Sequence, residues 1–419
     1  MNLPQEDVAS PRSVENCHKL RQLATNLLGA VTEYTLRGNM SGTQETSLKS
    51  RIVSITQDIR SLVKDPNDQW QLHNIQSHKM AAIKLFFSWH VFEHIPLYQS
   101  ISYVQLSDLL SVDFPLLVRV ARMLISTGVL EEDGPDRVAH TVNSRIFLPD
   151  NPYGNLNQVV LEYGLSNCHA VQYFDKNGRK EPDGVGPSPF TFTNGLLDSN
   201  IWNIYEDQTK ADIFMRAMTA LDRFAPITGT GLYSFAWIAN ASTTEDSKRP
   251  LLVDVGGGRG HAVEAICRST GLSLERCVLQ DKEPVISKLK GSERLSGLQL
   301  MSIDMHKEQP VKGALVYYIR HCLHDYSDDV ARGILRNISD AMTADSTLLI
   351  AEQVIGWPPK PESTAMDMLM LAVGGKERTE AEWHRLLQSS GLVLARIHET
   401  PGSSHCVIKC IKAAPTTPN

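Results

Sequence analysis

The sequence predicts an α/β fold: a Rossmann-like domain with a mostly parallel sheet and an antiparallel edge hairpin, preceded by an α-helical, winged-helix domain. Three observations support this prediction. Apolar residues recur at helical spacing in the first part of the chain, strands and helices alternate from residue 251 onward, and glycines crowd the first strand-to-helix turn. Because 419 residues exceed what one core usually holds, we expect two domains, 1–150 and 151–419.

The composition is ordinary for a soluble globular protein, with 42% hydrophobic and 21% charged residues. The formal net charge of −6 lacks the basic excess of most nucleic-acid-binding proteins, so we expect no nucleic-acid partner. The seven cysteines include no CxxC pair, and no apolar run approaches the ~18 residues of a membrane span. The first residues lack the apolar core of a signal peptide, so we expect a cytoplasmic protein with no membrane partner.

Three helices are predicted near the start of the chain, at 16–36, 45–64 and 78–96. Such helices are too apolar for a free surface, and dimers are the commonest closed assembly. We therefore expect a homodimer that forms through residues 16–127.

The segment 103–141 predicts a short helix, a longer helix and a hairpin, which is the order of a winged helix. The longer helix offers only Arg119 and Arg122 to a phosphate backbone. A packing and dimer-forming role is therefore favoured over DNA binding. Residues 151–248 are predicted to be rich in loops and aromatic side chains, with a flexible excursion at 176–187.

The glycine-rich stretch follows a short apolar strand, 251-LLVDV-255. Gly256, Gly258 and Gly260 give a G-x-G-x-G pattern at the point where this strand turns into a helix. A turn without side chains lets a ligand lie against the backbone and meet the amides at the start of the helix.

A second strand, 276–280, leads to Asp281, which lies 21 residues after Gly260. An acid about 20 residues beyond such a glycine motif commonly binds ribose hydroxyls. A third strand ends at Asp304 and Met305, an acid and an apolar side chain suited to the edge and face of adenine. With a closing hairpin at 392–412, these features favour S-adenosyl-L-methionine over a dinucleotide, whose fingerprint is G-x-G-x-x-G.

The fourth strand, which begins at residue 313, brings His321, His324 and Asp325 to its carboxyl end. Ligands of open α/β sheets bind beyond the carboxyl ends of the strands. This placement favours a functional role for His324 over that of a buried structural histidine. For His321, three residues earlier, the structural role is favoured.

The series DVGGGRG, VLQD, DM, R-x-x-x-HDY, LIAEQV and GGKERT resembles the plant-type small-molecule O-methyltransferases, including fungal members that modify polyketides. The resemblance covers residues from about 70 to 412. It implies that His324 of HDY removes the acceptor's proton and that Glu352 and Glu377 flank and orient the ring. The cofactor-binding residues that it implies are Gly256, Gly258, Asp281, Asp304, Met305 and Arg320, the last where the family often has lysine.

The resemblance also implies an acceptor pocket built from the segment 187–238 and from 364–375. Aromatic and thioether side chains would suit a flat, apolar acceptor, although a plain core shows the same helical spacing. The candidate lining residues are Trp202, Tyr205, Phe214, Met215, Met218, Met366, Asp367 and Met370.

The expected activity is S-adenosylmethionine-dependent O-methylation of a phenolic or enolic hydroxyl on an aromatic or polyketide-like secondary metabolite. A phenol of pKa ~10 must lose its proton as it attacks, and an imidazole of pKa ~6.5 is a suitable base. No metal is required, and Asp328 and Asp329 suit the start of a helix rather than a Mg²⁺ site.

Two other functions stay open. Some fungal relatives bind S-adenosylmethionine without transferring its methyl group and promote dehydrations or pericyclic ring closures. The retention of His324, Glu352 and Glu377 favours methyl transfer over that alternative. The other is a winged-helix regulator with a vestigial enzyme domain.

Overall fold

The computed structural model forms two compact units, Met1–Ala81 and Ala82–Asn419. The domain boundary that the sequence suggests at residue 150 stays a prediction. The structure describes residues 14–36, 42–224, 233–241, 248–399 and 405–414.

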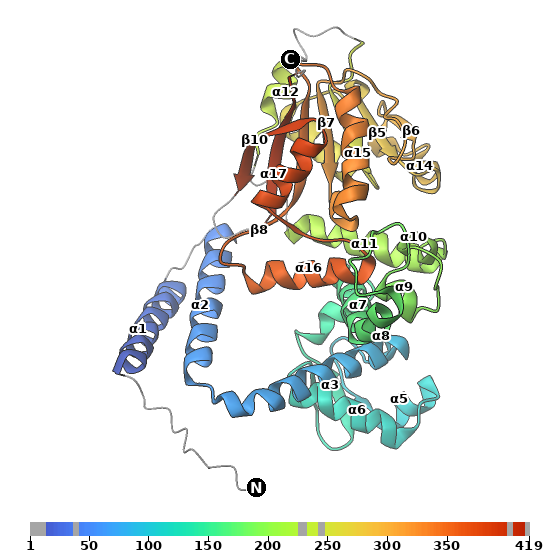
Figure 1. The fold of residues 1–419 in the computed structure, drawn as a ribbon. Helices are drawn as coiled ribbons and strands as arrows, with labels where there is room; N and C mark the ends of the chain where they lie inside the picture. The colour runs from blue at the N-terminus through green and yellow to red at the C-terminus, as the bar shows by residue number, and fades with distance from the viewer. Residues whose placement is uncertain (1–13, 37–41, 225–232, 242–247, 400–404, 415–419) are drawn as a thin grey trace. The chain divides into compact units, whose positions relative to one another are not determined.

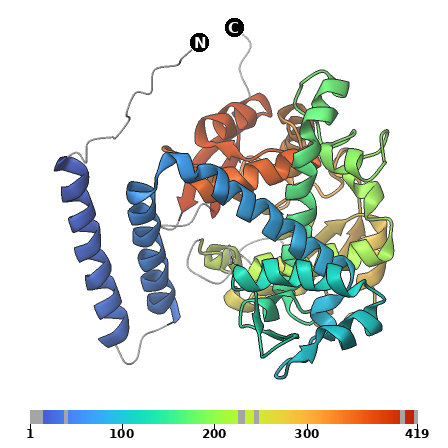
Figure 2. The ribbon, with the colours of Figure 1, turned by 90° about the horizontal axis from the view of Figure 1, so that it is seen from below.

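The first unit contains a pair of long helices, α1 (Val14–Leu36) and α2 (Gly42–Val63), which lie side by side (Figures 1 and 2). Their bounds confirm the two helices predicted at 16–36 and 45–64. The short η1 (Pro66–Asp68) follows, and then α3 (Gln69–Ser88) begins.

The helix predicted over 78–96 is wrong in its second half. It ends at Ser88, because His90 adopts the left-handed conformation with φ 56°, and a separate α4 (Val91–His94) follows. The helices and the hairpin predicted over 103–141 are present, and their strands form a sheet of order β1-β3-β2. Their classification as a winged helix stays a prediction. The elements are β1 (Ile101–Ser102), α5 (Tyr103–Leu110), α6 (Phe114–Ser126), β2 (Leu130–Glu132), β3 (Arg137–His140) and η2 (Ser144–Phe147).

The segment 151–248, predicted to be rich in loops, is largely helical where the structure describes it. Its turn-forming residues cap helices instead: Ser188 and Asn200 accept hydrogen bonds at helix starts, and Gly178 ends a helix at φ 81°. The helices are α7 (Pro152–Ser166), η3 (Asn167–His169), α8 (Ala170–Asn177), α9 (Pro189–Thr193), α10 (Ile201–Ile204), α11 (Gln208–Phe224) and α12 (Ala236–Ala241).

The large sheet of the second unit has the order β10-β11-β8-β7-β4-β5-β6, and β9 pairs with β8. The strands from β8 to β6 are parallel, whereas β10 and β11 form an antiparallel hairpin at one edge. This topology confirms the predicted Rossmann-like sheet with its antiparallel edge hairpin. The strands are β4 (Leu252–Val255), β5 (Cys277–Asp281), β6 (Gln299–Ser302), β7 (Val316–Arg320), β8 (Thr347–Ile355), β9 (Arg378–Thr379), β10 (Leu392–Glu399) and β11 (His405–Lys412).

Helices cover both faces of this sheet, as Figure 1 shows. Successive residues of β7 point to opposite faces. Tyr317 packs with α15 (Asp328–Ala341) and α17 (Glu380–Ser389), while Tyr318 packs with α12 and α13 (His261–Thr270). None of the described helices is long and apolar enough to cross a membrane. The remaining helices are α13 (His261–Thr270), η4 (Leu274–Arg276), α14 (Glu283–Leu289), η5 (Glu293–Leu295), η6 (Leu323–Asp325), α15 (Asp328–Ala341), α16 (Pro361–Val373) and α17 (Glu380–Ser389).

Two glycines pack directly against the turn that follows β7. A Cβ on Gly375, just after α16, would lie 1.9 Å from the carbonyl oxygen of His324. A Cβ on Gly184, within the excursion predicted at 176–187, would lie 2.1 Å from the carbonyl oxygen of Asp325. Only residues without side chains allow these backbones to approach so closely, so the glycines fix where the turn lies.

We predict that Gly375→Ala destabilises the protein by about 1–3 kcal/mol, because the new methyl group must displace the backbone of the turn. Thermal unfolding measures this change. The matched control is Gly333→Ala on α15, where an added Cβ meets nothing within 4 Å and which we expect to unfold at or above the wild-type temperature. Equal unfolding temperatures for the two variants would contradict the prediction.

Candidate active site

The glycine turn after β4 takes its shape from three left-handed residues. Gly256, Gly258 and Gly260 have φ angles of 70°, 55° and 79°, which explains why glycine recurs at alternate positions. A Cβ on Gly256 would lie 2.7 Å from Sγ of Cys322 and 3.3 Å from Cε of Met305. The G-x-G-x-G pattern therefore reflects both backbone conformation and close packing at the carboxyl edge of the sheet.

Asp281, at the end of β5, is tied to this turn by hydrogen bonds. Its Oδ2 accepts the N–H of Gly258 at 2.8 Å, and its Oδ1 accepts the N–H of Lys282 at 2.7 Å. Burial raises the pKa of the Asp281 carboxyl, and these two hydrogen bonds oppose that rise. Each oxygen keeps a further lone pair, so the carboxylate can also accept hydrogen bonds from a pair of hydroxyls.

Asp304 and Met305 follow β6 on the same edge. Asp304 Oδ1 accepts the N–H of His306 at 3.1 Å, and Met305 Cε would lie 3.3 Å from a Cβ on Gly256, a tight contact. Arg320 is the last residue of β7. The turn, the two acids and the thioether together fit a ligand with a ribose and an apolar base.

Glu352 of β8 holds the turn after β7 by hydrogen bonds to its backbone. Its Oε1 accepts the backbone N–H groups of Cys322 and Leu323, both at 3.0 Å. Glu352 is fully buried. His321, the first residue of the turn, has φ 48°, a conformation that few residues other than glycine adopt and that often marks a functional site.

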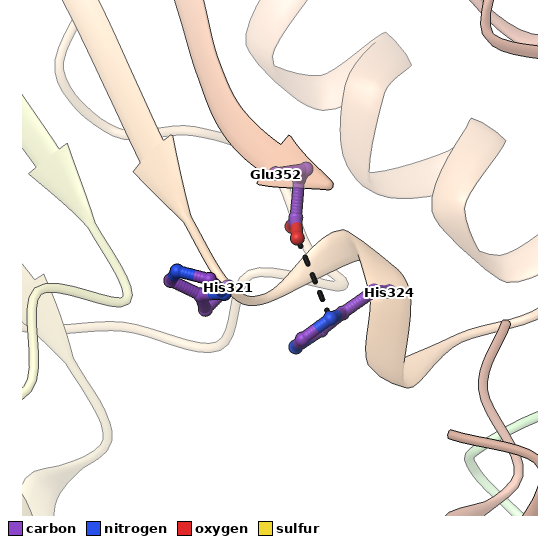
Figure 3. Close-up of side chains that lie close together, drawn as sticks. All are labelled: His321, His324 and Glu352. Atoms are coloured by element: carbon purple, nitrogen blue, oxygen red, sulfur yellow. Dashed lines mark ion pairs between the residues drawn. The ribbon is translucent and has the colours of Figure 1, made fainter. Parts of the chain in front are cut away.

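Three carboxylates surround the imidazole of His324. Its Nδ1 lies 2.9 Å from Glu377 Oε1 and 3.5 Å from Glu352 Oε2, and its Nε2 lies 3.7 Å from Asp325 Oδ1. Figure 3 shows the Glu352 carboxylate of β8 directed toward the ring. The two glutamates therefore face the same nitrogen, and Asp325 lies near the other one.

This surrounding charge changes the acid–base behaviour of the ring. Burial by itself would lower the pKa of His324, but the Glu352 and Glu377 carboxylates outweigh burial and raise that pKa to about 10. Burial raises the pKa of Asp325 to about 6, against the charge of His324, and burial also raises the pKa of Glu352. The ordinary imidazole pKa assumed from the sequence is therefore wrong for this site.

A buried arginine, which the sequence analysis missed, clamps the same turn. Arg378 donates from Nη1 to the carbonyl of Leu323 at 3.0 Å and from Nη2 to the carbonyl of Tyr326 at 2.8 Å. Its Nε donates to Asp328 Oδ1 at 2.8 Å, at the start of α15. The GGKERT motif contains this arginine, but nothing in the motif shows that its side chain reaches the ends of the HDY segment.

Aromatic and thioether side chains gather beside this turn in one apolar cluster. The rings of Tyr205 and Phe214 lie 4.4 Å apart, and those of Trp202 and Phe214 lie 6.3 Å apart. Met218, Met366 and Met370 belong to the same cluster, so the structure brings most of the predicted lining residues together. Tyr163 of α7, which the sequence analysis missed, bonds its hydroxyl to that of Tyr205 at 2.5 Å.

Two other predicted lining residues lie elsewhere. Met215 approaches the glycine turn, since its Cε would lie 3.8 Å from a Cβ on Gly258. Asp367 of α16 accepts the backbone N–H of Glu377 at 2.8 Å. The structure thus places Asp367 as a support for the glutamate that contacts His324, and Met215 next to the glycine turn.

A methyltransferase with a Rossmann-like sheet is the class of protein that this fold indicates, and comparison with known proteins agrees. The family model of the O-methyltransferase domain matches residues 197–393. Methyltransferase cfoD of Aspergillus candidus is 33% identical over 390 residues, which cover 90% of this chain and 95% of that protein. The chain therefore belongs to this methyltransferase family, which confirms the predicted family and its cofactor, S-adenosylmethionine.

Solved structures share the fold. The structure of OxaC in complex with SAH and oxaline aligns with a TM-score of 0.81 at 23% identity and covers 95% of this chain and 100% of that one. A structure described as a pericyclic reaction enzyme aligns with a TM-score of 0.72 at 19% identity, with the same coverage. The fold alone therefore does not separate methyl transfer from pericyclic chemistry.

The raised pKa of His324 predicts how stability depends on pH. Because the folded-state pKa of about 10 lies above the ordinary value of about 6.5, the charged ring contributes stability that is complete below about pH 6.5 and is lost as pH rises through about 10. The difference in unfolding temperature between wild type and His324→Asn should therefore shrink from pH 7 to pH 10. Differential scanning calorimetry measures it.

The control for this measurement is His384→Asn, on the exposed surface of α17. The difference in unfolding temperature between wild type and His384→Asn should not shrink from pH 7 to pH 10. A difference for His324→Asn that stays constant from pH 7 to pH 10 would contradict the prediction.

Proposed function

We propose that the protein is an S-adenosylmethionine-dependent O-methyltransferase that acts on a phenolic or enolic hydroxyl of an aromatic or polyketide-like secondary metabolite. The observation that carries this proposal is the imidazole of His324, which is oriented by Glu377 and Glu352 at the carboxyl edge of the sheet. A carboxylate that fixes the orientation of a histidine and stabilises its charged form is a recurrent feature of general-base catalysis.

The cofactor would be held by the residues around the glycine turn. S-adenosylmethionine supplies an electrophilic methyl group on a positively charged sulfur. Asp281 accepts hydrogen bonds from the ribose hydroxyls, and Asp304 and Met305 meet the adenine. Gly256 and Gly258 keep the turn free of side chains, and Arg320 stands at the end of β7 beside them. Because Asp281 is a charged acceptor for these hydroxyls, its replacement should weaken cofactor binding.

The acceptor would lie against the aromatic cluster, with its hydroxyl directed toward His324. Trp202, Tyr205, Phe214 and Met370 offer flat and polarisable surfaces to a planar molecule. Glu377 and Glu352 face Nδ1, which leaves Nε2 as the nitrogen that takes the proton. Only the neutral imidazole of His324 can accept the proton. The positive charge on the sulfur of S-adenosylmethionine favours that neutral form.

A second candidate function rests on the same histidine. With a pKa of about 10, His324 carries a proton at neutral pH, so it is suited to donate a hydrogen bond or a proton during a dehydration or a pericyclic ring closure. The likeness to a pericyclic reaction enzyme is compatible with this chemistry at the level of the fold. The base-orienting glutamates support methyl transfer instead.

We predict that His324→Ala lowers kcat for methyl transfer by ~10²–10⁴-fold, the usual contribution of general-base assistance, while S-adenosylhomocysteine binds as it does to wild type. Methyl transfer is followed by mass spectrometry with isotopically labelled cofactor, and binding by calorimetry. Asp281→Asn is the matched variant, in which cofactor binding weakens instead.

Unchanged turnover in His324→Ala would show that His324 is not the general base. A converted product that carries no label from the cofactor would favour the dehydratase or pericyclase function.

We also infer a cytoplasmic homodimer that forms through residues 16–127. The surface of this region carries exposed apolar side chains, including Leu28, Val53 and Trp70, which are 69%, 53% and 63% exposed. A dimer interface that covers such side chains removes their apolar surface from water.

Light scattering on the intact chain at micromolar concentration should therefore give the mass of a dimer. Leu28→Lys should shift the population toward the monomer, because it places a charge in the apolar interface. Val171→Lys, at a residue of α8 that is 70% exposed and lies outside 16–127, is the matched control and should stay dimeric. A monomeric wild-type chain refutes this inference.

A further inference from the structure

We propose that His321, His324 and Glu352 form a binding site for a divalent transition metal ion of the zinc class, and that the bound ion blocks the base. The regulatory part of this inference rests on the proposed function, whereas the binding part rests on the geometry alone. A neutral imidazole and a carboxylate oxygen are common ligands of Zn²⁺.

The three side chains offer ligand atoms that all lie within 4.8 Å of one another. Zn–N and Zn–O bonds of about 2.0–2.2 Å in tetrahedral geometry separate neighbouring ligand atoms by roughly 3.4 Å. The 3.5 Å between His324 Nδ1 and Glu352 Oε2 already matches that separation. His321, which lies to one side of this pair in Figure 3, offers the third ligand atom within the same 4.8 Å.

The buried carboxylates lack the hydrogen bonds that such groups usually make. Glu352 is fully buried and Glu377 is 3% exposed, yet Oε2 of each has no hydrogen-bond partner among the described residues. Buried charges are normally paired or coordinate metals, and one imidazole stands against three carboxylates here. A divalent cation that replaces the His324 proton brings two positive charges to these carboxylates in place of one and gives Glu352 Oε2 a bonding partner.

His321 has no part in the proposed chemistry, and the metal site gives it one. It begins the turn at φ 48°, and its ring centroid lies 5.5 Å from those of both His324 and His405. Glu352 holds the next two residues of the turn by their N–H groups, so the backbone that carries His321 is already fixed relative to one of the ligands. A site built on rigid elements needs little reorganisation to bind an ion.

The consequence is competition between metal binding and catalysis. The ion binds Nδ1 of His324, next to Glu352 Oε2, so it displaces the Nδ1 proton to solvent and replaces the contact with Glu377. The ring then cannot accept a proton from an acceptor hydroxyl. Binding of a zinc-class ion therefore inhibits methyl transfer reversibly, and removal of the ion by a chelator restores it.

The test uses Co²⁺, whose visible absorption reports its coordination, in titrations of the intact chain after treatment with a chelator. Wild type should bind one ion per chain at this site, with the absorption of a site of low coordination number. His321→Asn should weaken that binding by at least about tenfold, which is the lower range for loss of a group that supports a metal. The control His384→Asn removes an exposed histidine of α17 and should bind as wild type does.

Methyl transfer measured with and without Zn²⁺ then tests whether the bound ion inhibits the enzyme. Zn²⁺ should inhibit wild type and His384→Asn, whereas His321→Asn should keep its activity in the presence of Zn²⁺. Equal Co²⁺ binding by wild type and His321→Asn, or no such absorption in wild type, overturns the proposal. Co²⁺ binding that depends on His321, in a protein that transfers no methyl group, would refute the proposed function and leave the metal site standing.

Discussion

The contact between His324 and the buried carboxylates of Glu377 and Glu352 is the interaction on which the rest of the site depends. Two carboxylates that lose their water on folding are costly unless a positive charge compensates them. The imidazolium of His324 supplies that charge, and its Nδ1 lies within 3.5 Å of both. The ring is consequently held in one orientation, and its preference for the charged form follows from the same contacts.

Such an arrangement requires a rigid frame, because a small displacement would leave a buried charge unpaired. Arg378 binds carbonyl groups on both sides of His324, and Asp367 holds the backbone of Glu377. Gly375 has no side chain, so its backbone can pack directly against the carbonyl oxygen of His324. The motif GGKERT therefore does more than supply a carboxylate: its glycine, glutamate and arginine each fix a different part of one turn.

The sequence predicts the local features well, because they depend on residues that are close together in the chain. Glycines at alternate positions after a buried strand already indicate a turn with left-handed residues, and Asp281 ends the next strand of a parallel sheet. Contacts between residues that lie far apart in the chain cannot be predicted in this way. Nothing in the sequence shows that Arg378 reaches the turn or that Tyr163 bonds to Tyr205, and the helices of 151–248 were obscured because their capping residues are also turn formers.

The pKa of His324 is the least predictable property of all, since it depends on the distances among three carboxylates that come from separate segments. A direct test of this account is a titration of the histidine side chains by nitrogen-15 NMR, with the signal of His324 identified by its absence in His324→Asn. The account predicts that this ring stays protonated through neutral pH and titrates near pH 10. A titration near the ordinary value of about 6.5 would contradict it.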